Sequence, residues 1–199
     1  MGIIAIFGGS FNPIHIGHQE IIEQIRNIDD IDKVLIVPTK IPPHKESDYL
    51  ADANHRFCMC SLIASNYDNV EACDIELKRD GKSYTIDTVN SLLKEYNNCR
   101  LALTVGGDML VSFTNWKDYK DILKNCILIT FKRCGISDEE YQDGITKLKE
   151  IGAEIISINT EITDVSSTQI REELFHGKNS NLIDTKVKEY IFENNLYGV

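Results

Sequence analysis

Short apolar runs alternate along this chain with segments whose apolar residues recur every three or four positions. The runs are typical of strands buried on both faces, and the recurring spacing is typical of helices with one buried face. The runs predict strands at 3–7, 33–37, 70–77, 100–105, 126–131 and 154–158. The spacing predicts helices at 20–27, 52–65, 85–96, 118–124, 138–151, 167–176 and 184–194.

This alternation predicts an α/β fold. Buried strands separated by helices favour a doubly wound, Rossmann-like parallel sheet with right-handed crossovers and helices on both faces. A small C-terminal helical part follows the last strand. No repeat, low-complexity stretch or linker interrupts the pattern, so we expect one domain over residues 1–199.

In such a sheet, ligands lie outside the carboxyl ends of the strands. Glycine-rich or polar segments follow four of the predicted strands, at Gly8-Gly9, Pro38-Thr39, Gly106-Gly107 and Phe131-Lys132-Arg133. The carboxyl ends of parallel strands meet at one edge of the sheet, so these segments predict one shared crevice.

The first strand runs directly into a glycine turn and a helix start. Gly8-Gly9-Ser10-Phe11-Asn12-Pro13 is followed by His15 and His18, three residues apart. Glycine lets the backbone approach a ligand closely, and imidazoles at this spacing share one face of a helix. The free N–H groups and the dipole of a helix N-terminus favour an anion. The alternatives are an ordinary turn and two solvated histidines.

Two later segments have both a structural and a functional interpretation. In the loop at 39–50, Pro42-Pro43 stiffens the backbone, so the loop is either a solvated turn or a support that presents Lys40, His44 and Lys45 to an anion. Lys82-Ser83-Tyr84-Thr85 precedes a predicted helix, where Ser83 or Thr85 could be the N-cap.

Three more segments carry the same two interpretations. Gly106-Gly107-Asp108 is either a turn or a place where the Asp108 carboxylate binds ribose hydroxyls. Trp116 either packs in the core or offers a flat face to a ring. Ser166 and Gln169 predict a capping box, and the same helix start, with Arg171 one turn in, suits a polyphosphate tail.

Composition excludes several classes of function. The formal net charge of −10 argues against a diffuse nucleic-acid surface, which needs a basic face. No apolar run is long enough to span a membrane, so we expect no membrane partner. None of the six cysteines forms a Cys-x-x-Cys pair, which favours reduced thiols in a cytoplasmic protein over a structural zinc site.

The chain resembles the bacterial nicotinate-nucleotide adenylyltransferases of the HxGH nucleotidyltransferase superfamily along essentially its whole length. The resemblance rests on the segment from Gly8 to His18 and on later motifs in the same order: Pro42-Pro43-His44-Lys45, Ser83-Tyr84-Thr85, Gly106-Gly107-Asp108, Trp116, Ser166-Ser167-Thr168-x-Ile170-Arg171 and Val187-x-x-Tyr190-Ile191. Two positions depart from the family pattern. Asn12 stands where aspartate is frequent, and Cys134, after Arg133, stands where proline is common.

The resemblance implies transfer of the adenylyl group of ATP to nicotinate mononucleotide, with Mg²⁺ carried by the ATP phosphates. The implied catalytic residues are His15, His18 and Arg171. The implied ATP-binding residues are Gly8, Gly9, Ser10, Phe11, Gly17, Gly106, Asp108, Ser166, Ser167 and Thr168, with the helices from about residue 166 completing this site. The implied nicotinate mononucleotide-binding residues are Lys40, His44, Lys45, Tyr84, Thr85, Trp116 and Arg133. No protein ligand to a metal is expected, and the resemblance allows a homodimer.

The expected chemistry needs no protein nucleophile. The attacking group is the phosphate of the substrate, which is largely ionised near neutral pH because its second pKa is about 6. We therefore expect direct in-line attack without a covalent intermediate. The alternatives are a phosphopantetheine adenylyltransferase, a cytidylyltransferase, a fragment of a class I tRNA synthetase, and a sensor that binds ATP without releasing pyrophosphate.

Overall fold

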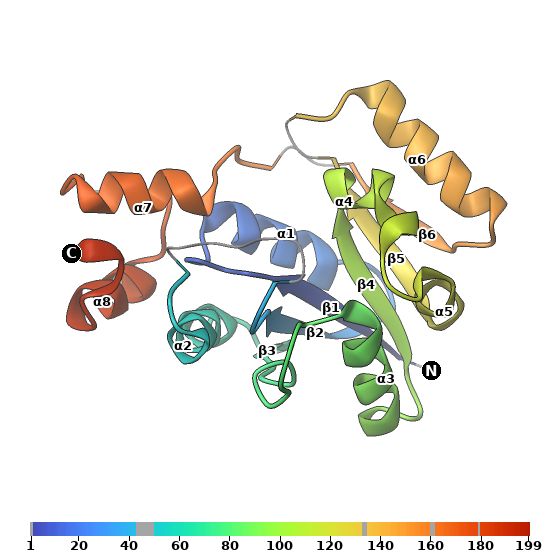
Figure 1. Ribbon diagram of the computed structural model, residues 1–199, viewed down its shortest axis with the longest axis horizontal. Coiled ribbons are helices and arrows are strands. Elements are labelled where there is room, and N and C mark those ends of the chain that lie inside the picture. The colour runs from blue at the N-terminus through green and yellow to red at the C-terminus, as the bar shows by residue number, and fades with distance from the viewer. Residues whose placement is uncertain (1, 43–49, 133–134, 160–161, 179) are drawn as a thin grey trace.

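The computed structural model describes residues 2–42, 50–132, 135–159, 162–178 and 180–199 (Figure 1). Three of the predicted site residues, His44, Lys45 and Arg133, lie outside these ranges, as does Cys134.

A parallel sheet forms the centre of the molecule. Within the described ranges its strands are β1 (Ile3–Gly9), β2 (Ile31–Pro38), β3 (Val70–Ala72), β4 (Arg100–Gly106), β5 (Cys126–Phe131) and β6 (Ile155–Ile158). They are ordered β3-β2-β1-β4-β5-β6, and every neighbouring pair is parallel. This confirms the predicted Rossmann-like, doubly wound sheet.

Helices follow the strands in the predicted alternation. The α-helices are α1 (Ile16–Arg26), α2 (Ala53–Ala64), α3 (Thr85–Glu95), α4 (Gly107–Val111), α5 (Tyr119–Asn125), α6 (Asp138–Glu150), α7 (Ser167–Phe175) and α8 (Thr185–Glu193). Two 3-10 turns, η1 (Phe113–Asn115) and η2 (Leu196–Gly198), complete the described elements. In Figure 1, α7 and α8 lie together at one end of the molecule, which is the predicted C-terminal helical part.

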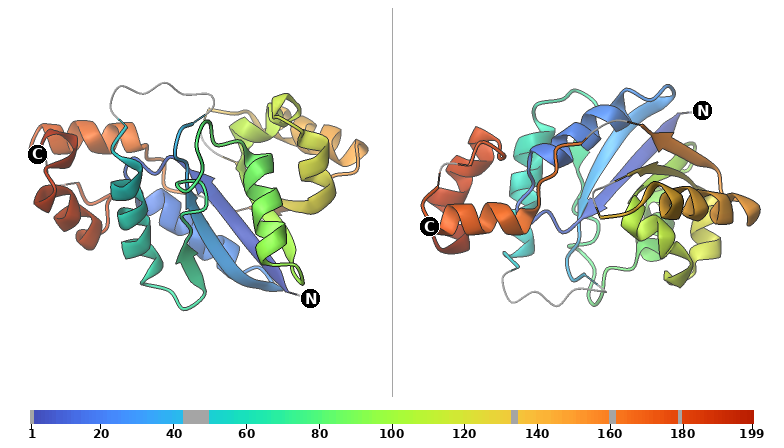
Figure 2. Two further views of the ribbon diagram at one scale, coloured as in Figure 1. Left: turned by 60° about the horizontal axis from the view of Figure 1, so that its bottom comes forward. Right: turned by 90° about the horizontal axis from the view of Figure 1, so that it is seen from above.

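The sheet has a buried core on each face because successive strand residues point to opposite sides. In β1, Ala5 and Phe7 pack with residues of α1, α2, α7 and α8, whereas Ile4 and Ile6 pack with residues of α3 to α6. Figure 2 shows α2 and α3 on opposite sides of the sheet. Strands covered on both faces explain why they read as continuous apolar runs rather than as alternating ones.

Three parts of the prediction are wrong in detail. The helix predicted over 20–27 begins four residues earlier, at Ile16. The strand predicted over 70–77 ends at Ala72, because Asp74 starts a turn in which its carbonyl accepts the Leu77 N–H at 2.9 Å. The turn considered at 106–108 is instead a helix start, since Gly106 is the N-cap of α4 and Asp108 lies in its first turn.

The cysteines that the structure describes are all free thiols. Cys60 and Cys126 are buried, and burial raises the pKa of both, for Cys126 to about 12. These two thiols are therefore protonated at neutral pH and chemically quiet. In the described part of the chain, no helix is both long and apolar enough to cross a bilayer.

Candidate active site

A cavity of about 490 Å³ opens at the carboxyl ends of four neighbouring strands. Gly8 and Gly9 of β1, Val37 of β2, Gly106 of β4 and Phe131 of β5 line it. The strand order runs outward in opposite directions from β1 and β4, so the cavity lies where that order reverses. This is the usual ligand position in doubly wound sheets, and it confirms the predicted crevice.

The remaining walls come from the segments that the sequence singled out. The start of α3, the start of α4 and the segment after η1 all reach this cavity. It brings together these predicted ATP-binding and nicotinate-binding residues: Gly8, Gly9, Ser10, His18, Gly106, Asp108, Tyr84, Thr85 and Trp116. Members of both predicted sets therefore line one cavity.

The two histidines are stacked, and only His18 lines the cavity. Their ring centroids lie 3.6 Å apart, and His15 is 2% exposed. The backbone N–H of His15 donates to His18 Nδ1 at 3.2 Å. A neutral His18 ring that accepts at Nδ1 carries its proton on Nε2, so the other ring nitrogen is a donor. His18 can therefore donate a hydrogen bond to a phosphate oxygen even when it is neutral.

The start of α7 packs on the turn that precedes the histidines. Ser167 Oγ donates to the Pro13 carbonyl at 2.9 Å, and Arg171 Nη1 donates to the Asn12 carbonyl at 2.8 Å. Arg171 Nη2 also donates to Thr168 Oγ1 at 3.2 Å. This brings the predicted polyphosphate helix to the edge of the histidine motif, although Ser166, Ser167, Thr168 and Arg171 do not line the cavity itself.

Only one of the two hydrogen bonds of the predicted capping box forms at the start of α7. Ser166 Oγ accepts the Gln169 N–H at 3.1 Å, as predicted. The Gln169 side chain, however, donates to Glu173 at 3.1 Å. A glutamine at this position can satisfy a carboxylate one turn later as easily as the N-cap backbone, and here it does so.

Two glycines of the motif lie in close contact with neighbouring groups, where a Cβ would force an adjustment. A Cβ on Gly9 would lie 2.9 Å from the Phe11 ring, and a Cβ on Gly17 would lie 3.0 Å from the Thr163 carbonyl oxygen. Phe11 itself is 1% exposed and packs edge-on against His18, with ring centroids 5.0 Å apart. The structure thus places the Phe11 side chain beneath the turn, where it supports His18.

Ser83 is not a helix cap. The N-cap of α3 is Tyr84, with no side-chain cap hydrogen bond, so the cap interpretation of Ser83 and Thr85 is wrong. Ser83 Oγ instead accepts the Lys40 N–H at 3.2 Å, which ties the loop after β2 to the start of α3. The Lys40 ammonium donates to the Arg79 carbonyl at 2.6 Å, and Lys40 does not line the cavity.

Trp116 packs on the core and also lines the cavity. One face of the indole stacks on the buried Phe113 ring, with centroids 4.9 Å apart and planes 29° apart. The half-buried side chain also lines the cavity. Phe113 therefore fixes the indole in place at the cavity wall.

Sequence reasoning missed a buried arginine in α2. Arg56 is 0% exposed and donates to the Ser10 carbonyl at 2.8 Å, the Ala51 carbonyl at 2.9 Å and the Lys40 carbonyl at 3.3 Å. It joins the glycine turn, the start of α2 and the loop after β2. The only sequence signal was an arginine shortly before the mostly apolar second half of a predicted helix, which is not specific.

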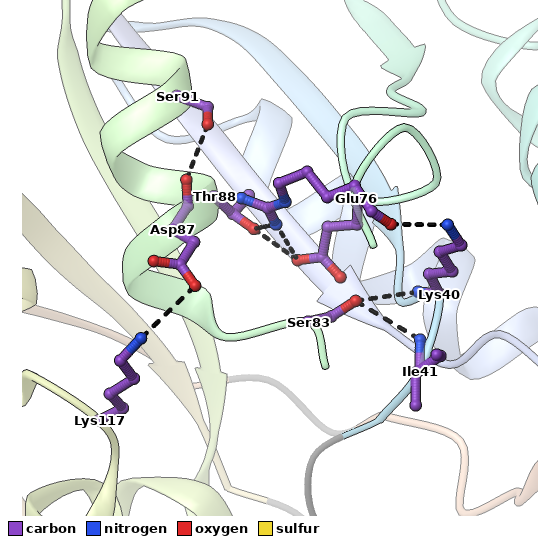
Figure 3. A network of polar contacts seen from close by, with 9 residues as sticks. Lys40, Ile41, Glu76, Ser83, Asp87, Thr88, Ser91 and Lys117 are labelled. Carbon is purple, nitrogen blue, oxygen red and sulfur yellow. Dashed lines mark hydrogen bonds and ion pairs between the residues drawn. The ribbon is translucent and has the colours of Figure 1, made fainter. Parts of the chain in front are cut away.

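A buried carboxyl in the cavity wall was missed as well. Glu76 is 7% exposed, and burial is the main cause that raises the pKa of its carboxyl. Thr88 Oγ1 of α3 donates to Glu76 Oε1 at 2.7 Å, and Arg79 Nη2 donates to the same hydroxyl (Figure 3). This network holds the turn after β3 against the start of α3.

Comparison with known proteins places the chain in a defined group. The cytidylyltransferase-like family matches residues 6–173. The chain is 39% identical over 197 residues to a protein of Halalkalibacterium halodurans named "probable nicotinate-nucleotide adenylyltransferase", covering 98% of this chain and 90% of that one. It is 37% identical to a protein of the same name from Fusobacterium nucleatum, covering 94% of this chain and 96% of that one.

A solved structure shares the fold. The nicotinic acid mononucleotide adenylyltransferase of Plasmodium falciparum, complexed with NaAD, matches with a TM-score of 0.80 at 22% sequence identity. The match covers 99% of this chain and 98% of that one. A likeness at this identity shows that the whole chain adopts the same arrangement of strands and helices.

Proposed function

This chain belongs to the cytidylyltransferase-like family, and we propose from that premise that it transfers the adenylyl group of ATP to nicotinate mononucleotide. The products are deamido-NAD and pyrophosphate. The observation that carries the proposal is the single cavity at the strand ends, where His18 and Asp108 lie in the same space as Tyr84, Thr85 and Trp116.

The residues have distinct roles in this proposal. Gly8, Gly9 and Ser10 let the backbone approach the phosphates, and His18 donates from Nε2 to the oxygens of the α-phosphate. The start of α7 and Arg171 bind the departing pyrophosphate, with Ser166, Ser167 and Thr168 supplying hydroxyls. Gly106 and Asp108 bind the adenosine ribose.

The acceptor binds on the other side of the cavity. Tyr84 and Thr85 begin α3, and Trp116 offers the indole face that Phe113 does not cover, which suits a flat pyridine ring. Lys40, His44, Lys45 and Arg133 stay expected ligands of nicotinate mononucleotide, the first three at its phosphate. For Lys40 this requires its ammonium to leave the Arg79 carbonyl.

The reaction is one displacement. An oxygen of the acceptor phosphate attacks the α-phosphorus of ATP, a P–O bond forms, and the bond to the pyrophosphate oxygen breaks. The acceptor phosphate is ionised, so no general base is needed. The protein aligns the two anions and stabilises the charge that develops on the α-phosphate and the leaving group. No adenylyl-enzyme forms.

Mg²⁺ enters this proposal with ATP rather than as a resident of the protein. Among the described residues, no group of three or more histidine, cysteine, aspartate or glutamate side chains is placed to hold a metal ion. The ion would be held by the phosphate oxygens, where it neutralises their charge. We further propose that residues 1–199 form one domain that acts in the cytoplasm, where its free thiols stay reduced.

A pyrophosphate-release assay tests the proposal. ATP is offered with nicotinate mononucleotide, nicotinamide mononucleotide or phosphopantetheine in turn, and CTP replaces ATP in a parallel set. The expected result is release with ATP and nicotinate mononucleotide and formation of deamido-NAD. Faster release with phosphopantetheine or with CTP would replace this function by a related one. Binding of ATP with no release from any pair would indicate a sensor.

A further inference from the structure

The cavity wall next to the proposed ring site carries one cation that the motifs do not include. Lys117 follows Trp116 and lines the cavity together with Tyr84 and Thr85. Of the lining residues within the described ranges, Lys117 is the only lysine or arginine, whereas Glu76 and Asp108 are acidic. A ring with a negative substituent would therefore find its favourable potential beside Lys117.

The Lys117 ammonium is held over the start of α3 by two groups. Its Nζ lies 4.6 Å from the centroid of the Tyr84 ring, a cation–π distance. It also lies 3.7 Å from Asp87 Oδ2, and Figure 3 shows this pair. The distance to Asp87 is that of an ion pair but exceeds that of a hydrogen bond. The ammonium is thus oriented without using its N–H donors on Asp87.

The backbone on each side of Lys117 is also fixed. Trp116 stacks on the buried Phe113, and Asp118 adopts a left-handed conformation, with φ of 52°, immediately before α5. Lys117 lies between these two anchored positions. The root of its side chain is consequently held at the cavity rim.

We propose that Lys117 is the residue that makes the site prefer the acid form of the pyridine ring over the amide form. The inference rests on the proposed function, because it needs the ring to lie between Tyr84 and Trp116. The ammonium attracts the ring carboxylate of nicotinate mononucleotide. In nicotinamide mononucleotide the same position carries a neutral carboxamide, which the ammonium attracts less. The two acceptors share the same ribose and phosphate, so the ratio of their kcat/KM values reports the effect of the ring substituent alone.

Asp87 moderates this preference. Its carboxylate pairs with Lys117 and lowers the attraction that the ammonium has for a second anion. Both side chains are about half exposed, at 47% for Lys117 and 44% for Asp87, so water screens the interaction. We expect loss of the ammonium to change the acid-to-amide ratio of kcat/KM by about five-fold.

The test measures kcat/KM with both acceptors in the wild type and three variants. Lys117→Met should lower the ratio by about five-fold, chiefly through nicotinate mononucleotide. Lys117→Arg keeps the charge and should keep most of the preference. Asp87→Asn removes the competing carboxylate and should raise the ratio. Lys120→Met is the matched control: this exposed lysine on α5 does not line the cavity and should leave the ratio unchanged.

The outcomes separate the inference from the proposed function. A wild type that prefers nicotinate mononucleotide, with an unchanged ratio in Lys117→Met, would overturn the inference alone. Equal losses with both acceptors would also overturn it, since they indicate that Lys117 only tethers the loop to α3. A wild type that releases pyrophosphate with neither acceptor would refute the proposed function and this inference with it. Calorimetry of each acceptor gives the ratio of the two Kd values, which measures the ground-state preference without turnover.

Discussion

Arg56 gives the sharpest test of how this site is held together. Its guanidinium is fully buried and donates to three carbonyls that belong to different segments. The guanidinium stays protonated, although burial lowers the pKa of Arg56. Replacing Arg56 by methionine keeps much of the volume but leaves the three carbonyls without this donor.

The expected loss follows from those three bonds. A hydrogen bond to a charged group contributes about 1.5–3 kcal/mol, so three of them set an upper limit of about 5–9 kcal/mol. Water that enters the vacated space restores part of these hydrogen bonds. The variant also avoids the free-energy cost of desolvating a guanidinium. We therefore expect Arg56→Met to lower the free energy of unfolding by about 3–4 kcal/mol.

Urea unfolding measures this loss. With an m-value of about 2 kcal/mol per molar, the midpoint should fall by about 1.5–2 M. Arg100→Met is the control, because Arg100 forms an exposed pair with Glu154 and its loss should cost less than about 1 kcal/mol. A loss of under about 1 kcal/mol in Arg56→Met, equal to that of the control, would refute the reasoning.

Three further predictions concern the cavity and its support. His18→Ala should lower turnover by about 100-fold or more with little change in melting temperature, and near-normal turnover in a pyrophosphate assay would contradict its role. A raised pKa means that folded Glu76 binds its proton more tightly than the unfolded chain does. Its favourable contribution is therefore present below the ordinary value of 4.5 and is lost as the pH rises through the folded pKa. Urea unfolding from pH 4 to 7 should thus show Glu76→Gln gaining stability relative to the wild type, and a constant difference would contradict this. Gly17→Ala should destabilise the fold by about 1–2 kcal/mol, because the added Cβ pushes the Thr163 carbonyl away. Gly8→Ala is the control and should not destabilise the fold, since nothing lies within 4 Å of a Cβ at that position. Equal melting temperatures of the two variants would refute the packing argument.

The strands could be predicted from the sequence because both faces of the sheet are covered. A strand such as β4 is buried from Leu101 to Val105 and is apolar there at every position except Thr104, a pattern that is hard to mistake. The end of β3 could not be predicted, because Ile75 and Leu77 continue the apolar pattern into the turn. Ile75 packs against the core from this turn, so an apolar residue here does not distinguish a turn from a strand.

The site could be predicted where a motif has its own local geometry. The turn before α1 and the glycines after β4 carry their signal within a few residues. The residues that could not be assigned from the sequence depend on partners that are distant along the chain. Ser83 could not be distinguished from a helix cap, because its true partner is the backbone of Lys40. Arg56 and Glu76 acquire their importance from burial against other segments, which no local spacing reveals.

The hydrogen bond from the Tyr197 hydroxyl to Asn12 Oδ1 spans 185 positions of the chain, at 2.9 Å. Asn12 belongs to the turn that prepares the histidine motif, so one support of this turn comes from the last helical turn described. During synthesis the N-terminal strands emerge first, and this support is missing until η2 has left the ribosome. A nascent chain can therefore expose the glycine turn before all of the contacts that hold that turn are in place.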